Sequence, residues 1–98
     1  MVVNYGELSR AYVTVNNVND ENRKFDVNAK AWVNENGCEN LEQGTVSENN
    51  VSIATFYYYA PTNLSVNFMC DLDRQNEILS TINEFVVACK DLGGVNTI

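Results

Sequence analysis

The chain of 98 residues contains no histidine. Histidine is the commonest general base and the commonest neutral metal ligand, so its absence excludes Ser-His-Asp and Cys-His catalytic arrangements within one chain. The 5 glycines also never fall at the spacing of a phosphate-binding loop. We therefore expect that the protein is not an enzyme, that it has no catalytic residues and that it binds no cofactor.

The cysteines suit neither a disulfide framework nor a zinc site, because their number is odd and no two are spaced as C-x-x-C. We expect Cys70 and Cys89 on core faces, and Cys38 exposed beside acidic residues that disfavour its thiolate. Asp71 and Asp73 could together hold a divalent cation, but carboxylates there are better explained as caps of a following helix. We expect no metal site.

Positive charge is missing between Ala31 and Asp73, a window of 43 residues without Lys or Arg. The formal net charge of -7 is therefore concentrated, and concentrated charge acts on partners at a distance. Phosphate contacts require clustered basic side chains, whereas Arg23-Lys24 is the only basic pair in the sequence. We expect no direct binding to DNA or RNA.

Long apolar runs are also missing. No segment reaches the roughly 20 apolar residues of a membrane span, and the first residues lack the basic-then-apolar pattern of a signal peptide. We therefore expect a cytoplasmic protein with no membrane partner. The length suits a single domain over residues 1–98.

Alternating polar and apolar residues are abundant in the first two thirds of the chain. Residues 25–33 place apolar side chains at odd positions, and residues 64–70 place them at even positions. Such alternation predicts strands with one buried face. Residues 51–60, rich in β-branched and aromatic side chains, and residues 8–15 predict two further strands. Pro61-Thr-Asn predicts a hairpin turn.

The apolar period changes after Asp73. From there to residue 92 the apolar side chains form one stripe at helical spacing, made of Ile78, Leu79, Ile82, Phe85, Val86 and Cys89. Asp71 or Asp73 suits the N-cap, and Gly93-Gly94 suits the C-terminal stop. This pattern predicts an amphipathic helix over residues 73–92.

These elements predict an α+β fold, in which a four-stranded, mainly antiparallel sheet carries one C-terminal amphipathic helix packed on one face (ββββα). The helix needs an apolar surface, and the inward face of the sheet is the only candidate. Residues 34–50 are too polar for a core and contain Asn36-Gly37 and Gly44. We therefore expect a long loop or an irregular excursion over residues 34–50, with a short helical turn around Cys38–Gln43 as a further alternative.

The sheet face that the helix leaves uncovered is predicted to be aromatic. Residues 56–59 alternate between the two faces, so either Phe56 with Tyr58 or Tyr57 with Tyr59 lies there. We assign to this face Tyr12, Trp32, Tyr57, Tyr59 and Met69. Such a composition is typical of an interface core and predicts a homodimer, unless the loop at residues 34–50 folds over this face.

Four glutamates of the expected loop form a candidate partner-binding patch: Glu35, Glu39, Glu42 and Glu48. A negative patch would steer association with a basic protein and could occlude a nucleic-acid site on that protein. The alternative is that these side chains only keep the protein soluble.

The acidity and the missing catalytic groups predict a non-enzymatic protein-binding module that acts on a basic, nucleic-acid-handling protein. By analogy of size and charge, we expect an inhibitor or immunity protein, or a counter-defence protein of a mobile element. A second hypothesis is a structural or assembly protein, such as a virion or scaffold component, that oligomerises through the aromatic face. A small-molecule binder is less favoured, because few cations could meet a phosphorylated ligand.

Overall fold

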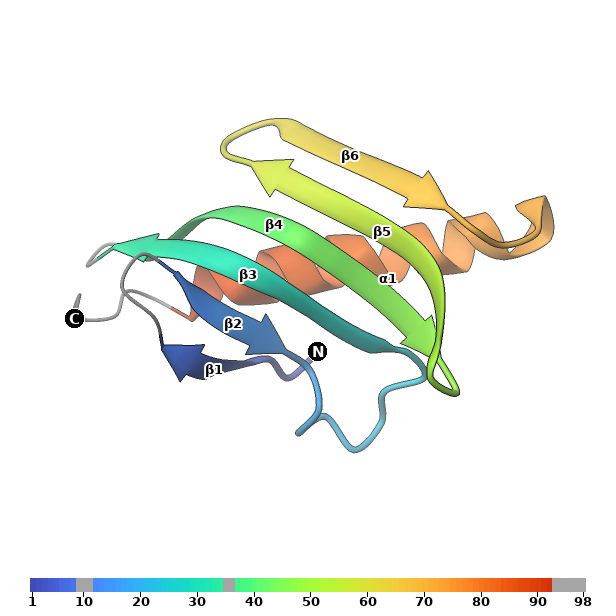
Figure 1. Ribbon diagram of the computed structural model, residues 1–98, viewed down its shortest axis with the longest axis horizontal. Coiled ribbons are helices and arrows are strands. Elements are labelled where there is room, and N and C mark those ends of the chain that lie inside the picture. Colours follow the sequence, from blue (N-terminus) through green and yellow to red (C-terminus); the bar gives the residue numbers. More distant parts are fainter. Residues whose placement is uncertain (9–11, 35–36, 93–98) are drawn as a thin grey trace.

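Six strands and one helix make up the described part of the computed structural model, which comprises residues 1–8, 12–34 and 37–92. The strands are β1 (Asn4–Leu8), β2 (Val13–Asn16), β3 (Asp26–Asn34), β4 (Gly37–Glu48), β5 (Val51–Tyr59) and β6 (Asn63–Phe68), and the helix is α1 (Leu72–Asp91). Each strand pairs antiparallel with the next one along the chain, so the sheet order is β1-β2-β3-β4-β5-β6 (Figure 1). The α+β class and the C-terminal helix are confirmed, but the predicted number of four strands is wrong.

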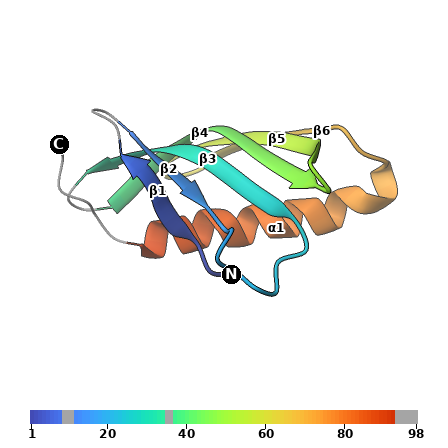
Figure 2. The same cartoon turned by 60° about the horizontal axis from the view of Figure 1, so that its bottom comes forward.

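The sheet and the helix form two layers (Figure 2). Helix α1 crosses one face of the sheet, where it lies closest to β4 and β5. The buried core lies between these layers and includes Val15, Ala31, Leu41, Ile82 and Phe85, all of them completely or almost completely enclosed. Among the described residues no element covers the opposite face, which we call the open face (Figure 1).

Three of the four predicted strands fall where the sequence predicts them. The predictions at 25–33, 51–60 and 64–70 correspond to β3, β5 and β6. The strand predicted at 8–15 is wrong, because that segment holds the end of β1 and most of β2, and residues 9–11 lie outside the described residues.

The predicted loop at residues 34–50 is also wrong, because most of it is β4, a strand of 12 residues inside the sheet. Its inward positions are Leu41, Gly44 and Val46, all buried. They are spaced by three and then two residues because the pairing register shifts between Leu41 and Gly44, and Gln43 has a φ of 52°. One extra residue in a strand breaks the period-2 pattern. Since β4 pairs within the sheet, it does not fold over the open face.

Helix α1 matches its predicted span to within one residue at each end. The buried part of its stripe is Ile78, Ile82, Phe85, Val86 and Cys89. Leu79 was expected in that stripe but is 36% exposed, because it lies at the margin of the buried face. Asp71 holds the N-cap position without a side-chain cap, and its backbone carbonyl accepts a hydrogen bond from the Arg74 N–H at 3.0 Å. The predicted stop at Gly93-Gly94 lies outside the described residues.

Candidate interaction surface

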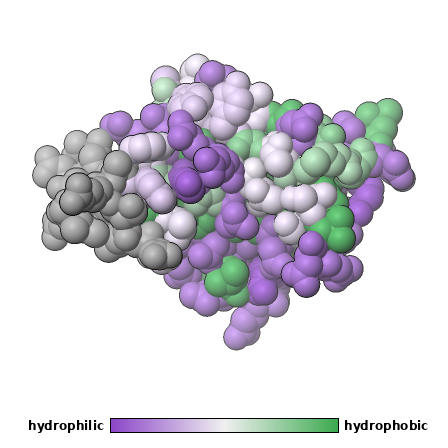
Figure 3. Space-filling model, viewed as in Figure 1, coloured by the Kyte–Doolittle hydropathy of each residue, from purple (hydrophilic) through white to green (hydrophobic). Residues whose placement is uncertain are grey.

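Most of the open face is polar and suited to water. One row of cross-strand partners runs across all six strands and consists of Asn4, Asn16, Asn28, Thr45, Thr55 and Asn67. Figure 3, which views this face, shows weakly polar and strongly polar residues over most of the area. Antiparallel sheets commonly keep one face in water, so this row needs no binding partner.

One end of the open face is aromatic instead. Tyr12, which precedes β2, packs edge-on against Trp32 of β3, with ring centroids 6.1 Å apart. Tyr57 and Tyr59 of β5 form a second pair, with centroids 5.1 Å apart. Trp32, Tyr57 and Tyr59 are each between 37% and 40% exposed. These rings are packed against each other yet remain open to a partner.

Glu42 of β4 lies between the two aromatic pairs, because β4 separates β3 from β5. The Tyr59 hydroxyl donates a hydrogen bond to Glu42 Oε1 at 2.8 Å. Hydrogen bonds from the side chains of Trp32 and Tyr59 hold the pKa of Glu42 below its ordinary value, and the charge of Lys30 acts in the same direction. The same hydrogen bond raises the pKa of Tyr59. Glu42 is therefore an ionised carboxylate held in place at neutral pH.

Lys30 completes this group of residues. It is the cross-strand partner of Glu42, and its ammonium nitrogen lies 4.8 Å from the ring centroid of Tyr12. A cation over an aromatic face is attracted by the ring. We call this group the Glu42 cluster, and it consists of Tyr12, Lys30, Trp32, Glu42, Tyr57 and Tyr59.

A shallow hollow of about 430 Å³ lies next to the Glu42 cluster on the open face. Its lining residues come from β4, β5 and β6 and include Gln43, Gly44, Tyr57, Ser65 and Asn67. The β-bulge of β4 lies at its rim, since the register shift ends at Gly44. The hollow is large enough to hold a side chain beside the aromatic rings.

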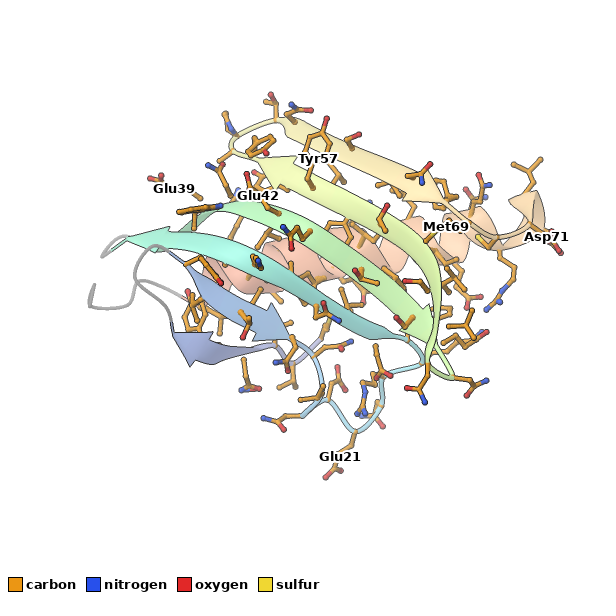
Figure 4. All side chains as sticks on the ribbon, viewed as in Figure 1. Glu21, Glu39, Glu42, Tyr57, Met69 and Asp71 are labelled. Carbon is orange, nitrogen blue, oxygen red and sulfur yellow. The ribbon has the colours of Figure 1, made fainter. Side chains whose placement is uncertain are left out.

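The predicted acidic patch is not one surface. Glu39 is exposed at a register irregularity near the end of the sheet where Glu42 lies (Figure 4). Glu48 lies six residues beyond Glu42 in the same strand, a distance of about 20 Å, and forms a 3.0 Å ion pair with Arg74 of α1. The hydrogen bond from Arg74 lowers the pKa of Glu48. Glu35 lies outside the described residues.

Four of the five residues assigned to the aromatic face come together, and Met69 does not. It follows the last residue of β6, whereas Tyr59 pairs with the first, Asn63. That separation is about 20 Å along the strand, and Figure 4 shows Met69 away from Tyr57 at the far end of β6. Lys30 was missed, although its position two residues before Trp32 places both on the same face. The place of Glu42 beside the rings could not be predicted, because it depends on residues 37–48 forming strand β4.

Two of the three cysteines have thiols whose pKa is raised, Cys38 and Cys89. Cys38 was expected to be exposed but is half-buried, and burial together with the charge of Glu39 raises its pKa to about 11. Cys89 is buried, which raises its pKa further, and Cys70 is half-buried. No group of three Cys, Asp or Glu residues suited to a metal ion occurs in the described ranges.

In the described part of the chain, no helix is both long and apolar enough to span a membrane. Comparison with known proteins yields no match, either to a family model, to a curated protein or to a solved structure.

Proposed function

We propose that this protein is a non-enzymatic protein-binding module whose Glu42 cluster recognises a basic segment of a partner protein. The observation that carries this proposal is the hydrogen bond from Tyr59 to Glu42, which holds an ionised carboxylate among partly exposed aromatic rings. A carboxylate binds guanidinium groups through paired hydrogen bonds, and aromatic faces attract the same cations. Arginine is therefore the side chain that fits this surface best.

The composition of the Glu42 cluster also suits a binding hot spot. Tryptophan and tyrosine dominate the energetics of many protein interfaces, because they provide a large contact area at a low cost in conformational entropy. The exposed fractions near 40% at Trp32 and Tyr57 leave that area available. The hydrogen bond from Tyr59 already restrains the Glu42 side chain, so less conformational freedom is lost when a partner binds.

The net charge indicates which class of partner the proposed module attracts. A chain with a charge of -7 attracts basic proteins from a distance, and this raises the association rate at low salt. A nucleic-acid-handling protein uses clustered Arg and Lys to bind phosphate. A module that occupies those side chains blocks the nucleic-acid site, which is the action of an inhibitor, immunity or counter-defence protein.

The experiment is affinity capture from the native host, followed by mass spectrometry, with three forms of the protein as bait. The wild type, Glu42→Gln and Glu21→Gln are compared. Glu21 is exposed in the connector before β3, away from the Glu42 cluster (Figure 4), so its substitution removes the same charge from a different place. We expect a basic protein that is retained by the wild type and by Glu21→Gln and lost by Glu42→Gln. Equal retention by all three forms would refute the assigned site.

The exposed rings of Trp32, Tyr57 and Tyr59 also support the second candidate, an assembly protein that self-associates through the open face. Trp32→Ala distinguishes the two functions. If assembly is the function, this substitution abolishes oligomers in light scattering and leaves the circular dichroism spectrum unchanged. If recognition of a basic partner is the function, it weakens partner binding and leaves the oligomeric state as it is in the wild type.

A further inference from the structure

The two edges of the sheet differ in how they are protected. Strands β1 and β6 are the edge strands, and an edge strand presents N–H and C=O groups that can pair with another chain. Charged residues and bulges usually discourage such pairing. β1 contains Glu7 and has a register shift between Tyr5 and Leu8. β6 contains no charged residue and pairs with β5 without interruption.

The outward backbone groups of β6 belong to Leu64, Val66 and Phe68. The Met69 N–H donates to the Ile53 carbonyl oxygen of β5 at 2.8 Å. Along an antiparallel strand the backbone groups of successive residues point alternately to either side. The backbone N–H and C=O groups of the odd-numbered residues of β6 therefore point toward β5, and those of the even-numbered residues point away from it. Among the described residues no other strand lies on that outward side.

This outward edge is complementary to a second copy of itself. If two β6 strands pair antiparallel with Val66 opposite Val66, then Leu64 lies opposite Phe68. The outward N–H and C=O groups of all three residues then find partners, which gives about six hydrogen bonds. Leu64, Val66 and Phe68 are also only partly buried, because β6 extends beyond the area that α1 covers (Figure 1). Pairing would bring these apolar side chains into contact across the two copies.

The distribution of charge also favours this edge. Two copies of a chain with a net charge of -7 repel each other over distances of about 10 Å at ordinary salt. Residues 49–70, which include β5 and β6, contain no charged side chain. Copies that meet at β6 therefore approach through the part of the sheet with the weakest repulsion.

We propose that β6 is a self-association edge through which two copies form one continuous antiparallel sheet. The two-fold axis of such a pair runs perpendicular to the sheet at Val66, so both helices lie on one side and both open faces on the other. The Glu42 cluster stays exposed in this dimer, and the inference does not depend on the proposed function. A six-residue strand makes a small interface, so the dissociation constant is expected on the order of 10–100 µM.

The first test is sedimentation of the full chain from about 5 µM to 1 mM, together with amide hydrogen exchange at both ends of this range. We expect a monomer–dimer equilibrium that shifts toward the dimer as salt screens the repulsion. The amides of Leu64, Val66 and Phe68 should exchange more slowly at high concentration, whereas those of Ser65 and Asn67 should be slow at both. A strict monomer at 1 mM, or a dimer without this alternating protection, would overturn the proposal.

The second test compares Val66→Pro with Val66→Thr. Proline at residue 66 removes an N–H that points outward and leaves the hydrogen bonds to β5 intact. Edge strands tolerate proline at such a position. We expect at least a tenfold rise in the dissociation constant for Val66→Pro and less than a threefold change for Val66→Thr, which keeps the N–H and the β-branch. Circular dichroism checks the fold of both. An equally strong dimer in Val66→Pro would contradict the proposal, and the exchange pattern of the wild type decides the question if that variant does not fold.

Discussion

At the scale of single residues, Gly44 shows how tightly the sheet and the helix are fitted. It lies directly opposite Phe56 on β5, and a Cβ atom at Gly44 would come within 2.6 Å of the Phe56 ring. That ring packs edge-on against Phe85 of α1, with centroids 6.0 Å apart. The absence of a side chain at Gly44 therefore leaves the space that Phe56 fills.

We predict that Gly44→Ala lowers the free energy of unfolding by about 1–3 kcal/mol, the usual cost of overpacking a core. The measurement is urea denaturation followed by circular dichroism. Gly6→Ala is the comparison variant, because its Cβ would meet the Thr14 side chain on the open face rather than an aromatic ring in the core. A cost for Gly6→Ala as large as that for Gly44→Ala would show that strand glycines, rather than Phe56, set the penalty.

Asn17 is a buried polar residue whose side-chain amide is fully hydrogen-bonded within the protein. It is 0% exposed, accepts a hydrogen bond from the Val27 N–H at 2.9 Å and donates one to the Phe25 carbonyl at 3.0 Å. These bonds fix the connector between β2 and β3. Because both ends of the amide are satisfied, Asn17 gives no indication of a ligand.

At the scale of elements, the sequence could predict those whose hydrophobic period is unbroken. β3, β6 and α1 each keep one period, so their positions follow from spacing. β5 is predicted by its β-branched and aromatic composition instead, because a register shift against β4 leaves the consecutive residues Ile53 and Ala54 both buried. β4 could not be predicted, because its bulge shifts the inward positions by one residue and its outward residues are polar. The same rule explains the site. Period 2 places Tyr57 and Tyr59 on one face but does not decide which face, whereas the place of Glu42 depends on β4.

The Arg74–Glu48 ion pair links the start of α1 to the end of β4, and it carries a pH-dependent contribution to stability. The pKa of Glu48 is lowered in the folded state, so this contribution is present above the ordinary value of 4.5 and is lost as the pH falls through the folded-state pKa. We predict that Glu48→Gln is less stable than the wild type at pH 7 and equally stable at pH 2. Thermal unfolding at several pH values measures the difference.

Glu21→Gln is the control for this prediction, because Glu21 is exposed and its substitution removes the same unit of charge. We expect no loss of stability for it at pH 7. If Glu21→Gln and Glu48→Gln behave alike, the effect comes from net charge, and the ion pair with Arg74 contributes nothing measurable.

At the scale of the whole molecule, the two proposed contacts lie on two different surfaces. The Glu42 cluster holds its carboxylate at one end of the open face, where a basic partner can reach it. The β6 edge lies in the uncharged part of the chain, where a second copy can approach. Salt distinguishes these contacts, because it weakens attraction between opposite charges and weakens repulsion between like charges. Partner binding should therefore become weaker with salt, and self-association should become stronger.

Binding of arginine to the Glu42 cluster can be measured directly through the fluorescence of Trp32. Trp32 is the only tryptophan of the chain, so its fluorescence reports on this site alone. The protein, at about 1 µM to keep it monomeric, is titrated with the peptide acetyl-Arg-Gly-Arg-Gly-Arg-amide, with its Glu counterpart as the negative control. Wild type, Glu42→Gln and Glu21→Gln are compared, and the two variants have equal net charge.

We predict a saturable change in Trp32 emission with the Arg peptide for the wild type and Glu21→Gln, an affinity at least fivefold weaker for Glu42→Gln, and no change with the Glu peptide. Equal affinity of all three forms, or Trp32 emission that does not respond to the Arg peptide at millimolar concentration, would rule out arginine recognition by the Glu42 cluster.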